Sequence, residues 1–227
     1  MTSLTARLDR LLGRVTMYRL VLVWLGLIGV VALGLTLVGD LAFGPLDLLA
    51  SAAVALTVSY VVNRILARAF GVRPHSESTL ITAALLVMIF QPTLDLAGLG
   101  ALAVASLVAV ASKYLIAVRG RHILNPAAFG ALFIGLIGLD FSVWWVATPT
   151  LLPLVLIAAF TILFRTRRLP LGAVFLVVAA GLIIVRGVVS GQDPVSALTG
   201  AFTSYPILFF AGFMLSEPLT LPPRRWQ

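Results

Sequence analysis

Long apolar runs alternate with short polar stretches along the whole chain. A helix that crosses a membrane needs about 20 mostly apolar residues. Backbone polar groups find no water in lipid, so an open sheet is excluded and each run is expected to be helical. The pattern predicts an all-α polytopic membrane protein with eight transmembrane helices, the third and fifth of them short, at residues 17–38, 47–68, 78–92, 96–118, 124–139, 143–164, 171–190 and 196–216.

The basic residues form five clusters, and two predicted helices separate each cluster from the next. Lys and Arg gather in the cytoplasmic loops of membrane proteins. The pattern therefore predicts a cytoplasmic N-terminal segment, 1–16, a single membrane domain, 17–227, and a cytoplasmic C-terminus. The intervening loops carry aspartates and are predicted to lie outside. The basic clusters are Arg7–Arg19, Arg64–Arg73, Lys113–Arg121, Arg165–Arg168 and Arg224–Arg225.

The composition supports a membrane protein and excludes other classes. The chain is 61% hydrophobic and 11% charged, with a mean hydropathy of +1.12, whereas a soluble domain carries roughly a quarter charged residues. The net charge of +8 is divided among the loops. A nucleic-acid partner is therefore not expected, because the basic residues form no single patch, and membrane lipid is the expected surrounding.

The absence of cysteine limits the chemistry that the chain could carry. It excludes disulfides, cysteine-ligated iron–sulfur clusters and thiolate zinc sites. The two histidines, His75 and His122, both fall in basic loops, which argues against a haem held between helices by two histidines. No metal site is predicted, so an electron carrier here would be something other than a metal on Cys or His.

The sequence contains a weak internal repeat: residues near the end of the chain match residues 126 positions earlier, in its first half. The repeating unit is five helices, and because five is odd, the second copy crosses the membrane in the opposite sense, as in many transport folds. Repeat 1 covers about 17–139, and repeat 2, about 143–227, lacks its last two helices. A partner could supply these helices, the fold could close without them, or the chain could be a fragment. The matched pairs are Ser78 with Ser204, Ile81 with Ile207, Met88 with Met214, Gln91 with Glu217 and Pro92 with Pro218.

Asn125 and Pro126 open the fifth apolar run and are typical of the start of a helix. The alternative to simple capping is that this helix end binds an anion such as a phosphate, with Lys113 nearby. Small residues follow, and they allow either close helix packing or a flat ligand. These residues are Ala127, Ala128, Gly130 and Ala131.

Five other polar or aromatic positions lie near helix ends. Trp144 and Trp145 are predicted to be interfacial anchors. Arg186 is a basic residue in an outer half, where it could snorkel outward or pair with Asp193 or Asp140, and Asp193 itself is predicted to cap a helix. Glu217 lies where the last helix meets the cytoplasm. It could bind a cation, relay a proton, pair with Arg224 or Arg225, or simply be solvated.

Three stretches together resemble one family of membrane proteins. "SKYLIAVRGRHILNPAAFGALFIGL" (Ser112–Leu136) is similar to the lysine-to-Asn-Pro-Ala segment of NqrB and RnfD, the membrane subunits of sodium-pumping NADH:quinone reductase and of the Rnf electron-transport complex. "FFAGFMLSEPLTLPP" (Phe209–Pro223) resembles the family's phenylalanine-rich helix, and "SESTLITAALLVMIFQP" (Ser76–Pro92) resembles its serine-led third helix. The resemblance covers most of residues 60–223, in the same order.

This resemblance implies a urea-transporter-like fold of ten helices in two inverted halves, in a prokaryotic cytoplasmic membrane. It also implies FMN or riboflavin as cofactor, with one FMN esterified to a threonine. Thr148, in "WVATPT", is the best candidate, although Trp145 and Val146 depart from the family's small residues before it. The other candidate flavin-site residues are Ser78, Lys113, Asn125 and Glu217.

Two functions from different classes follow. The first is a membrane flavin-binding subunit of an electron-transport oxidoreductase, with or without coupled ion translocation. It would work with other redox subunits, with a partner or fused NAD(P)H or ferredoxin reductase domain, or with quinone. The second is a small-solute channel or transporter without redox chemistry. Polar residues within the helices support it, namely Ser59, Asn63, Thr82, Ser106, Ser112 and Thr161.

Overall fold

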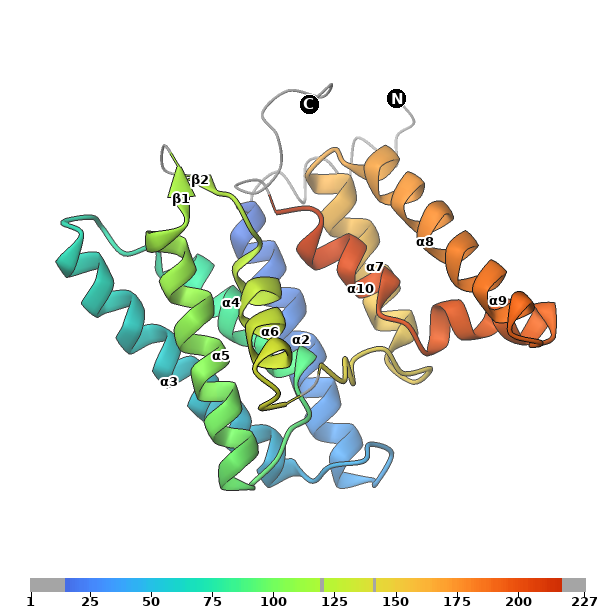
Figure 1. Ribbon diagram of the computed structural model, residues 1–227, viewed down its shortest axis with the longest axis horizontal. Helices are drawn as coiled ribbons and strands as arrows, with labels where there is room; N and C mark the ends of the chain where they lie inside the picture. The colour runs from blue at the N-terminus through green and yellow to red at the C-terminus, as the bar shows by residue number, and fades with distance from the viewer. Residues whose placement is uncertain (1–14, 119–120, 141, 218–227) are drawn as a thin grey trace. The chain divides into compact units, whose positions relative to one another are not determined.

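The computed structural model describes residues 15–118, 121–140 and 142–217, and these ranges are mostly helical (Figure 1). The chain divides into two compact units, which we describe separately. The α3–α6 unit is Leu25–Trp145. The α7–η1 unit is Val146–Glu217 together with the chain up to Trp24, so α2 (Met17–Leu37) contributes to both units.

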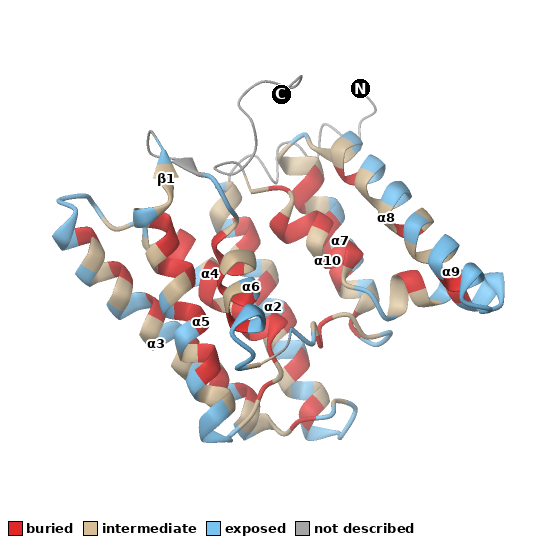
Figure 2. Cartoon of the chain, in the orientation of Figure 1, coloured by how far each residue is buried: buried red, intermediate tan, exposed pale blue. Residues whose placement is uncertain are grey.

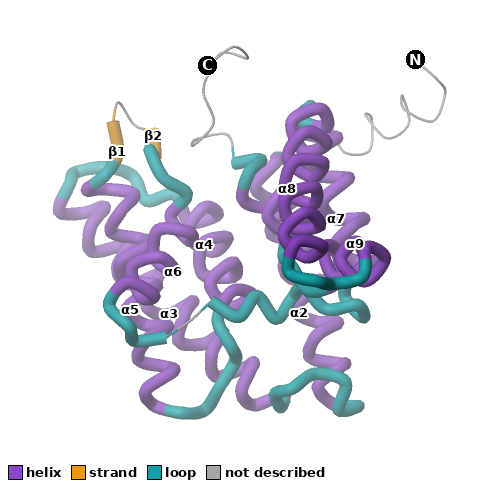
Figure 3. Tube along the Cα trace, turned by 45° about the vertical axis from the view of Figure 1, so that its right-hand side comes forward, coloured by secondary structure: helices purple, strands orange, loops and turns teal. Residues whose placement is uncertain are grey.

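The α3–α6 unit contains four further helices and a short hairpin. A two-residue strand pair, visible at the end of α5 in Figure 3, joins α5 to α6, with Ala117 opposite His122 and Val118 opposite Arg121. The elements are α3 (Pro45–Ala69), α4 (Ser76–Ile89), α5 (Leu96–Leu115), β1 (Ala117–Val118), β2 (Arg121–His122) and α6 (Pro126–Leu136).

The α7–η1 unit contains the helices α7 and α8 and a bent last segment. That segment begins with α9 (Pro194–Thr203), breaks, and continues at an angle of 48°. The other elements are α7 (Leu152–Arg165), α8 (Leu169–Val189), α10 (Ile207–Phe209) and the π-helix η1 (Phe210–Met214).

Every predicted apolar run contains a helix, and four of these helices are long and apolar enough to cross a membrane. They are α2, α3, α5 and α8, and the bent pair of α9 with α10–η1 would make a fifth span. Helices α4, α6 and α7 are apolar but shorter. The described residues are therefore compatible with an all-α membrane protein, and the prediction of eight crossings goes beyond this finding.

Two of the predicted helices differ from the structure: one begins later than predicted, and the other is interrupted. The prediction 143–164 starts too early, because α7 begins only at Leu152. The backbone N–H groups of Val143 and Trp144 instead donate to the Ile89 carbonyl, at 2.9 and 2.8 Å. The prediction 196–216 is interrupted after Thr203, because Pro206 has no N–H for a helical bond and restricts the residue before it.

Helix ends in the described residues follow local rules of capping. Asp95 and Asp193 accept N–H bonds at the starts of α5 and α9, which confirms the predicted cap at Asp193. Four helices end at a glycine with positive φ, a conformation that a side chain disfavours. These glycines are Gly39, Gly71, Gly138 and Gly191.

Helix α4 is the most deeply packed element of the α3–α6 unit. It contacts α3, α5 and α6, and its residues from Leu85 to Ile89 are all buried, as is the C-cap residue Phe90 (Figure 2). The second half of α4 is apolar on all sides because it packs on all sides. The long helix α8 differs, since among its residues only Gly172, Ala180 and Gly187 are buried.

Candidate functional site

The central polar contact of the α3–α6 unit joins Lys113 on α5 to Ser78 on α4. The Lys113 Nζ atom donates to the Ser78 carbonyl at 2.9 Å and to the Ser78 Oγ atom at 3.0 Å. Both side chains are buried, with exposed fractions of 9% and 6%. Lys113 is also the only lysine in the chain. A buried ammonium is costly unless hydrogen-bonded, so this contact fixes how α4 and α5 meet.

The first turn of α4 is organised around Ser78. The His75 ring is the cap of α4, and its Nδ1 atom accepts the Ser78 N–H at 3.2 Å. The Thr82 hydroxyl donates to the Ser78 carbonyl at 3.0 Å, and the Thr79 hydroxyl donates to the His75 carbonyl at 3.2 Å. The Lys113 ammonium lies in the last turn of α5, where the helix dipole favours a positive charge.

A second polar contact lies beside the first one. The Tyr114 hydroxyl contacts the Asn63 side-chain oxygen at 2.5 Å and the Asn63 carbonyl at 3.2 Å. Asn63 is buried on α3, and its Nδ2 atom has no partner in the described structure. We call Asn63, Ser78, Lys113 and Tyr114 the Lys113 cluster. It joins the end of α3, the start of α4 and the end of α5.

Asn125 caps α6, as the sequence predicts. Its Oδ1 atom accepts the Ala128 N–H at 3.1 Å, and Pro126 occupies the first turn. The small residue Gly130 serves close helix packing, because a Cβ at this position would lie 2.6 Å from the Ala105 carbonyl oxygen. At Gly130, the prediction that small residues leave room for a flat ligand therefore does not apply.

The Trp145 side chain is buried, so its predicted role as an interfacial anchor is wrong. Its exposed fraction is 5%, and its indole N–H donates to the Val87 carbonyl at 2.7 Å. The ring also packs edge-on against Phe43, with centroids 5.0 Å apart. Trp145 therefore closes the C-terminal end of α4, where helix carbonyls lack partners within the helix.

Thr148 and Glu217, the two remaining candidates, belong to the α7–η1 unit. The Thr148 residue is half-buried, and its hydroxyl oxygen is fully buried without a hydrogen-bond partner in the described structure. Its carbonyl accepts the Leu152 N–H at 3.0 Å. Glu217 is half-buried at the end of the described range, and Pro218, Arg224 and Arg225 lie outside it.

The candidate residues include hydrogen-bond donors of the kind that a flavin accepts. A lysine ammonium and a serine hydroxyl can donate to a phosphate or to carbonyl oxygens of the flavin ring. A buried hydroxyl without a partner, as at Thr148, is unfavourable, and a phosphoester would remove its donor proton. Because that oxygen is buried, esterification requires the side chain to turn outward.

The structure joins two of the predicted site residues, Ser78 and Lys113, in one contact. Sequence analysis missed His75 and Tyr114 as members of the site. A histidine three residues before a serine and a tyrosine directly after the only lysine were the available signals. Comparison of the chain with protein-family models, curated proteins and solved structures finds no match.

Proposed function

We propose that this chain is a flavin-binding membrane subunit of an electron-transport oxidoreductase of the NqrB/RnfD kind. The observation that carries the proposal is the buried contact between Lys113 and Ser78. These residues come from two separate stretches that resemble the family. Their direct contact supports a single site formed by both stretches.

The membrane topology of the proposal combines helices with charge. Four long apolar helices, one bent pair and three shorter apolar helices match the eight predicted runs. With the basic clusters in the cytoplasm, the chain crosses a prokaryotic inner membrane eight times and has both termini inside. Under this proposal, the inverted five-helix repeat relates residues 17–139 to residues 143–227.

Flavin supplies one-electron and two-electron transfer, and the protein supplies binding, orientation and tuning of the potential. Lys113 and Ser78 would hold the flavin by donating hydrogen bonds, and the positive charge of Lys113 would favour a reduced, anionic ring. Thr148 would carry FMN if the attachment is covalent. Asn125 would present the N-terminus of α6, and Glu217 is retained as a candidate from the matched repeat. Electrons would pass between a reductase partner and quinone or another redox subunit.

The test is to express the full chain in a bacterial host that supplies flavin and its transferase, and to measure visible flavin absorbance per chain. Wild-type protein is expected to be coloured. Ser78→Ala is expected to lose flavin, whereas Ser112→Ala should keep it. Ser112 is a matched control, because its buried hydroxyl bonds only to the Ala109 carbonyl of its own helix at 2.8 Å. Colourless wild-type protein would refute the proposal.

Attachment at Thr148 needs its own experiment. After acid precipitation, flavin that remains in the protein pellet is covalent, and peptide mass spectrometry locates it. Thr148→Ala is expected to release the flavin, and Thr150→Ala is the control because Thr150 is an exposed neighbour. Retention of the pellet colour in Thr148→Ala would contradict attachment at this residue.

A small-solute channel is the second candidate, and one observation favours it. Among the described residues, the side-chain oxygens of Ser59 and Ser106 and the Asn63 Nδ2 atom are buried and have no hydrogen-bond partner. Buried polar groups of this kind are usually satisfied by water, and a hydrated path along α3 and α5 would supply it. Colourless protein that increases solute flux into liposomes, with flux reduced by Ser59→Ala, would favour the channel.

A further inference from the structure

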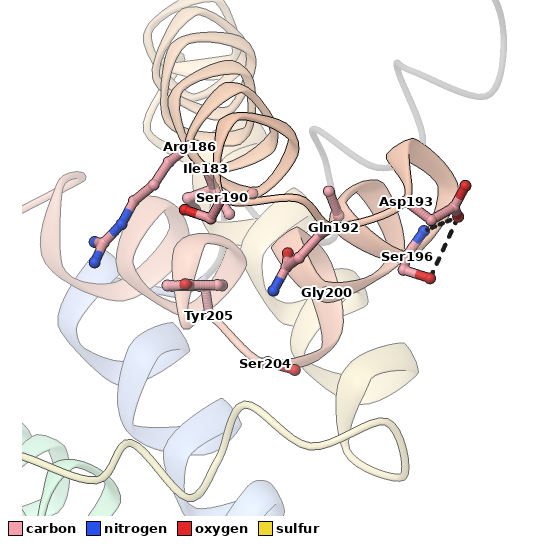
Figure 4. Close-up of a pocket in the computed structure, with 11 residues that line it drawn as sticks. Ile183, Arg186, Ser190, Gln192, Asp193, Ser196, Gly200, Ser204 and Tyr205 are labelled. Atoms are coloured by element: carbon pink, nitrogen blue, oxygen red, sulfur yellow. Dashed lines mark hydrogen bonds between the residues drawn. The ribbon is translucent and has the colours of Figure 1, made fainter.

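A cavity of about 740 Å³ opens in the α7–η1 unit, between the end of α8 and the start of the bent last segment (Figure 4). It takes no part in the function proposed above. All residues that line it come from one continuous stretch, 183–205. Its polar lining includes Arg186, Ser190, Gln192, Ser196, Ser204 and Tyr205.

Arg186 and Asp193 both line this cavity, but they do not pair with each other. The Arg186 side chain makes no ion pair or hydrogen bond with any described residue of its own unit, so the alternative of a pairing with Asp193 is not found there. Asp193 instead caps the start of α9. Its Oδ2 atom accepts the N–H groups of Val195 and Ser196 at 3.1 and 3.0 Å, and the Ser196 hydroxyl at 3.3 Å.

Further donors line the cavity beside the guanidinium. The Ser190 and Tyr205 hydroxyls and the Gln192 amide have no protein partner in the described structure. In Figure 4 the Arg186 side chain and the Tyr205 ring lie on one side of the cavity, and the Asp193–Ser196 cap lies on the other. The acid therefore faces its own helix, while the side of the cavity around Arg186 offers mainly hydrogen-bond donors.

Arg186 is also the only charged residue of α8, an otherwise apolar helix. Placing arginine in such a helix is unfavourable in lipid, and these residues usually mark ligand pathways. The guanidinium has a planar fork of donors that matches two phosphate oxygens at once. The donors, the volume and the unpaired guanidinium therefore favour an anionic ligand on the Arg186 side of the cavity.

We propose that this cavity binds a phosphate group, held by the Arg186 guanidinium and the Tyr205 and Ser190 hydroxyls. The group has two possible sources, a phospholipid headgroup or a soluble phosphate. The site lies at the end of α8 that the charge pattern places outside the membrane. It is independent of flavin and of the Lys113 cluster.

The experiment uses the purified full chain in detergent. One arm measures the thermal transition with inorganic phosphate against chloride at equal ionic strength. The other arm measures retention of added phosphatidylglycerol by native mass spectrometry. A response to inorganic phosphate assigns a soluble ligand, and retention of lipid alone assigns a headgroup. A response in neither arm overturns the proposal.

Two variants and a control locate the site. Arg186→Gln is expected to weaken binding at least tenfold, and Tyr205→Phe, which removes only a hydroxyl, a few-fold. Arg168→Gln, at the opposite end of the same helix, removes the same charge and is expected to bind like the wild type. Equal binding by the Arg186→Gln and Arg168→Gln variants would overturn the assignment, and Tyr205→Phe provides a check that does not depend on the loss of a charge.

Discussion

The contact between α5 and α6 at Gly130 leaves no room for a side chain. In Gly130→Ala, the new Cβ would lie 2.6 Å from the Ala105 carbonyl oxygen and 2.9 Å from the Ala109 Cβ atom. Carbon–oxygen contacts between helices are normally about 3.3–3.6 Å, and carbon–carbon contacts are optimal at about 3.5–4.0 Å. Helix α6 would therefore have to withdraw by about 0.7–1 Å, against a backbone that cannot rotate away.

The size of the effect follows from two opposing contributions. Alanine is favoured over glycine in a helix by about 0.8–1 kcal/mol. Overpacking of a close contact typically costs about 1–3 kcal/mol. Gly100→Ala in α5 is the matched control, because no atom lies within 4 Å of a Cβ at Gly100. The two variants share the helix-propensity gain, so the difference between them, about 1–3 kcal/mol, isolates the clash.

The assay is reversible unfolding of the full chain in mixed micelles, with increasing denaturing detergent and far-ultraviolet circular dichroism as the signal. Gly130→Ala is expected to unfold at a lower detergent fraction than the wild type, and Gly100→Ala at an equal or higher one. If Gly130→Ala proves as stable as Gly100→Ala, the two helices do not meet at Gly130 as described.

Three further predictions concern individual hydrogen bonds. Lys113, the only lysine, is expected to react slowly with an amine-specific reagent, as measured by peptide mass spectrometry; Ser78→Ala should speed the reaction, and equal rates in Ser78→Ala and Ser112→Ala would contradict the contact. Asn125→Ala should lower the unfolding free energy by about 1 kcal/mol through loss of a helix cap, whereas Asn125→Asp should retain it; equal losses in both would contradict the cap. Trp145→Phe leaves a buried carbonyl of α4 without its donor and should cost about 1–3 kcal/mol, and an unchanged midpoint in the same unfolding assay would refute this role.

The positions of the helices could be predicted because they depend on local properties of the sequence. Apolar runs, aspartates before helices and glycines after them act over a few residues. One of the two wrong helix predictions occurred where a distant partner decides the structure. The stretch 142–151 is apolar enough for a helix, yet the N–H groups of Val143 and Trp144 bond to Ile89, more than 50 residues earlier. The break at Pro206 is a local signal that the long apolar run concealed.

The candidate site was predictable only in part, because it also depends on contacts between residues that are distant in the sequence. Ser78 and Lys113 could each be selected from the sequence, but their contact depends on how α4 and α5 pack. Trp145 shows the limit of composition, because a tryptophan near a helix end is typical of an interface, whereas here its ring is buried. A cavity such as that around Arg186 depends on how the end of α8 packs against α9, and only a structure gives that.

The two ends of α4 have a consequence for biogenesis. With 14 residues, α4 is shorter than the roughly 17–25 residues that a span requires, so it is poorly suited to leave the insertion machinery as an independent span. In its first turn, the Ser78 carbonyl accepts a hydrogen bond from the ammonium of Lys113. In its last turn, the Val87 carbonyl accepts one from the indole N–H of Trp145. Both partners are synthesised later than α4 itself. We therefore expect nascent chains that end before Trp145 to keep α4 accessible to chaperones and proteases, and longer chains to protect it.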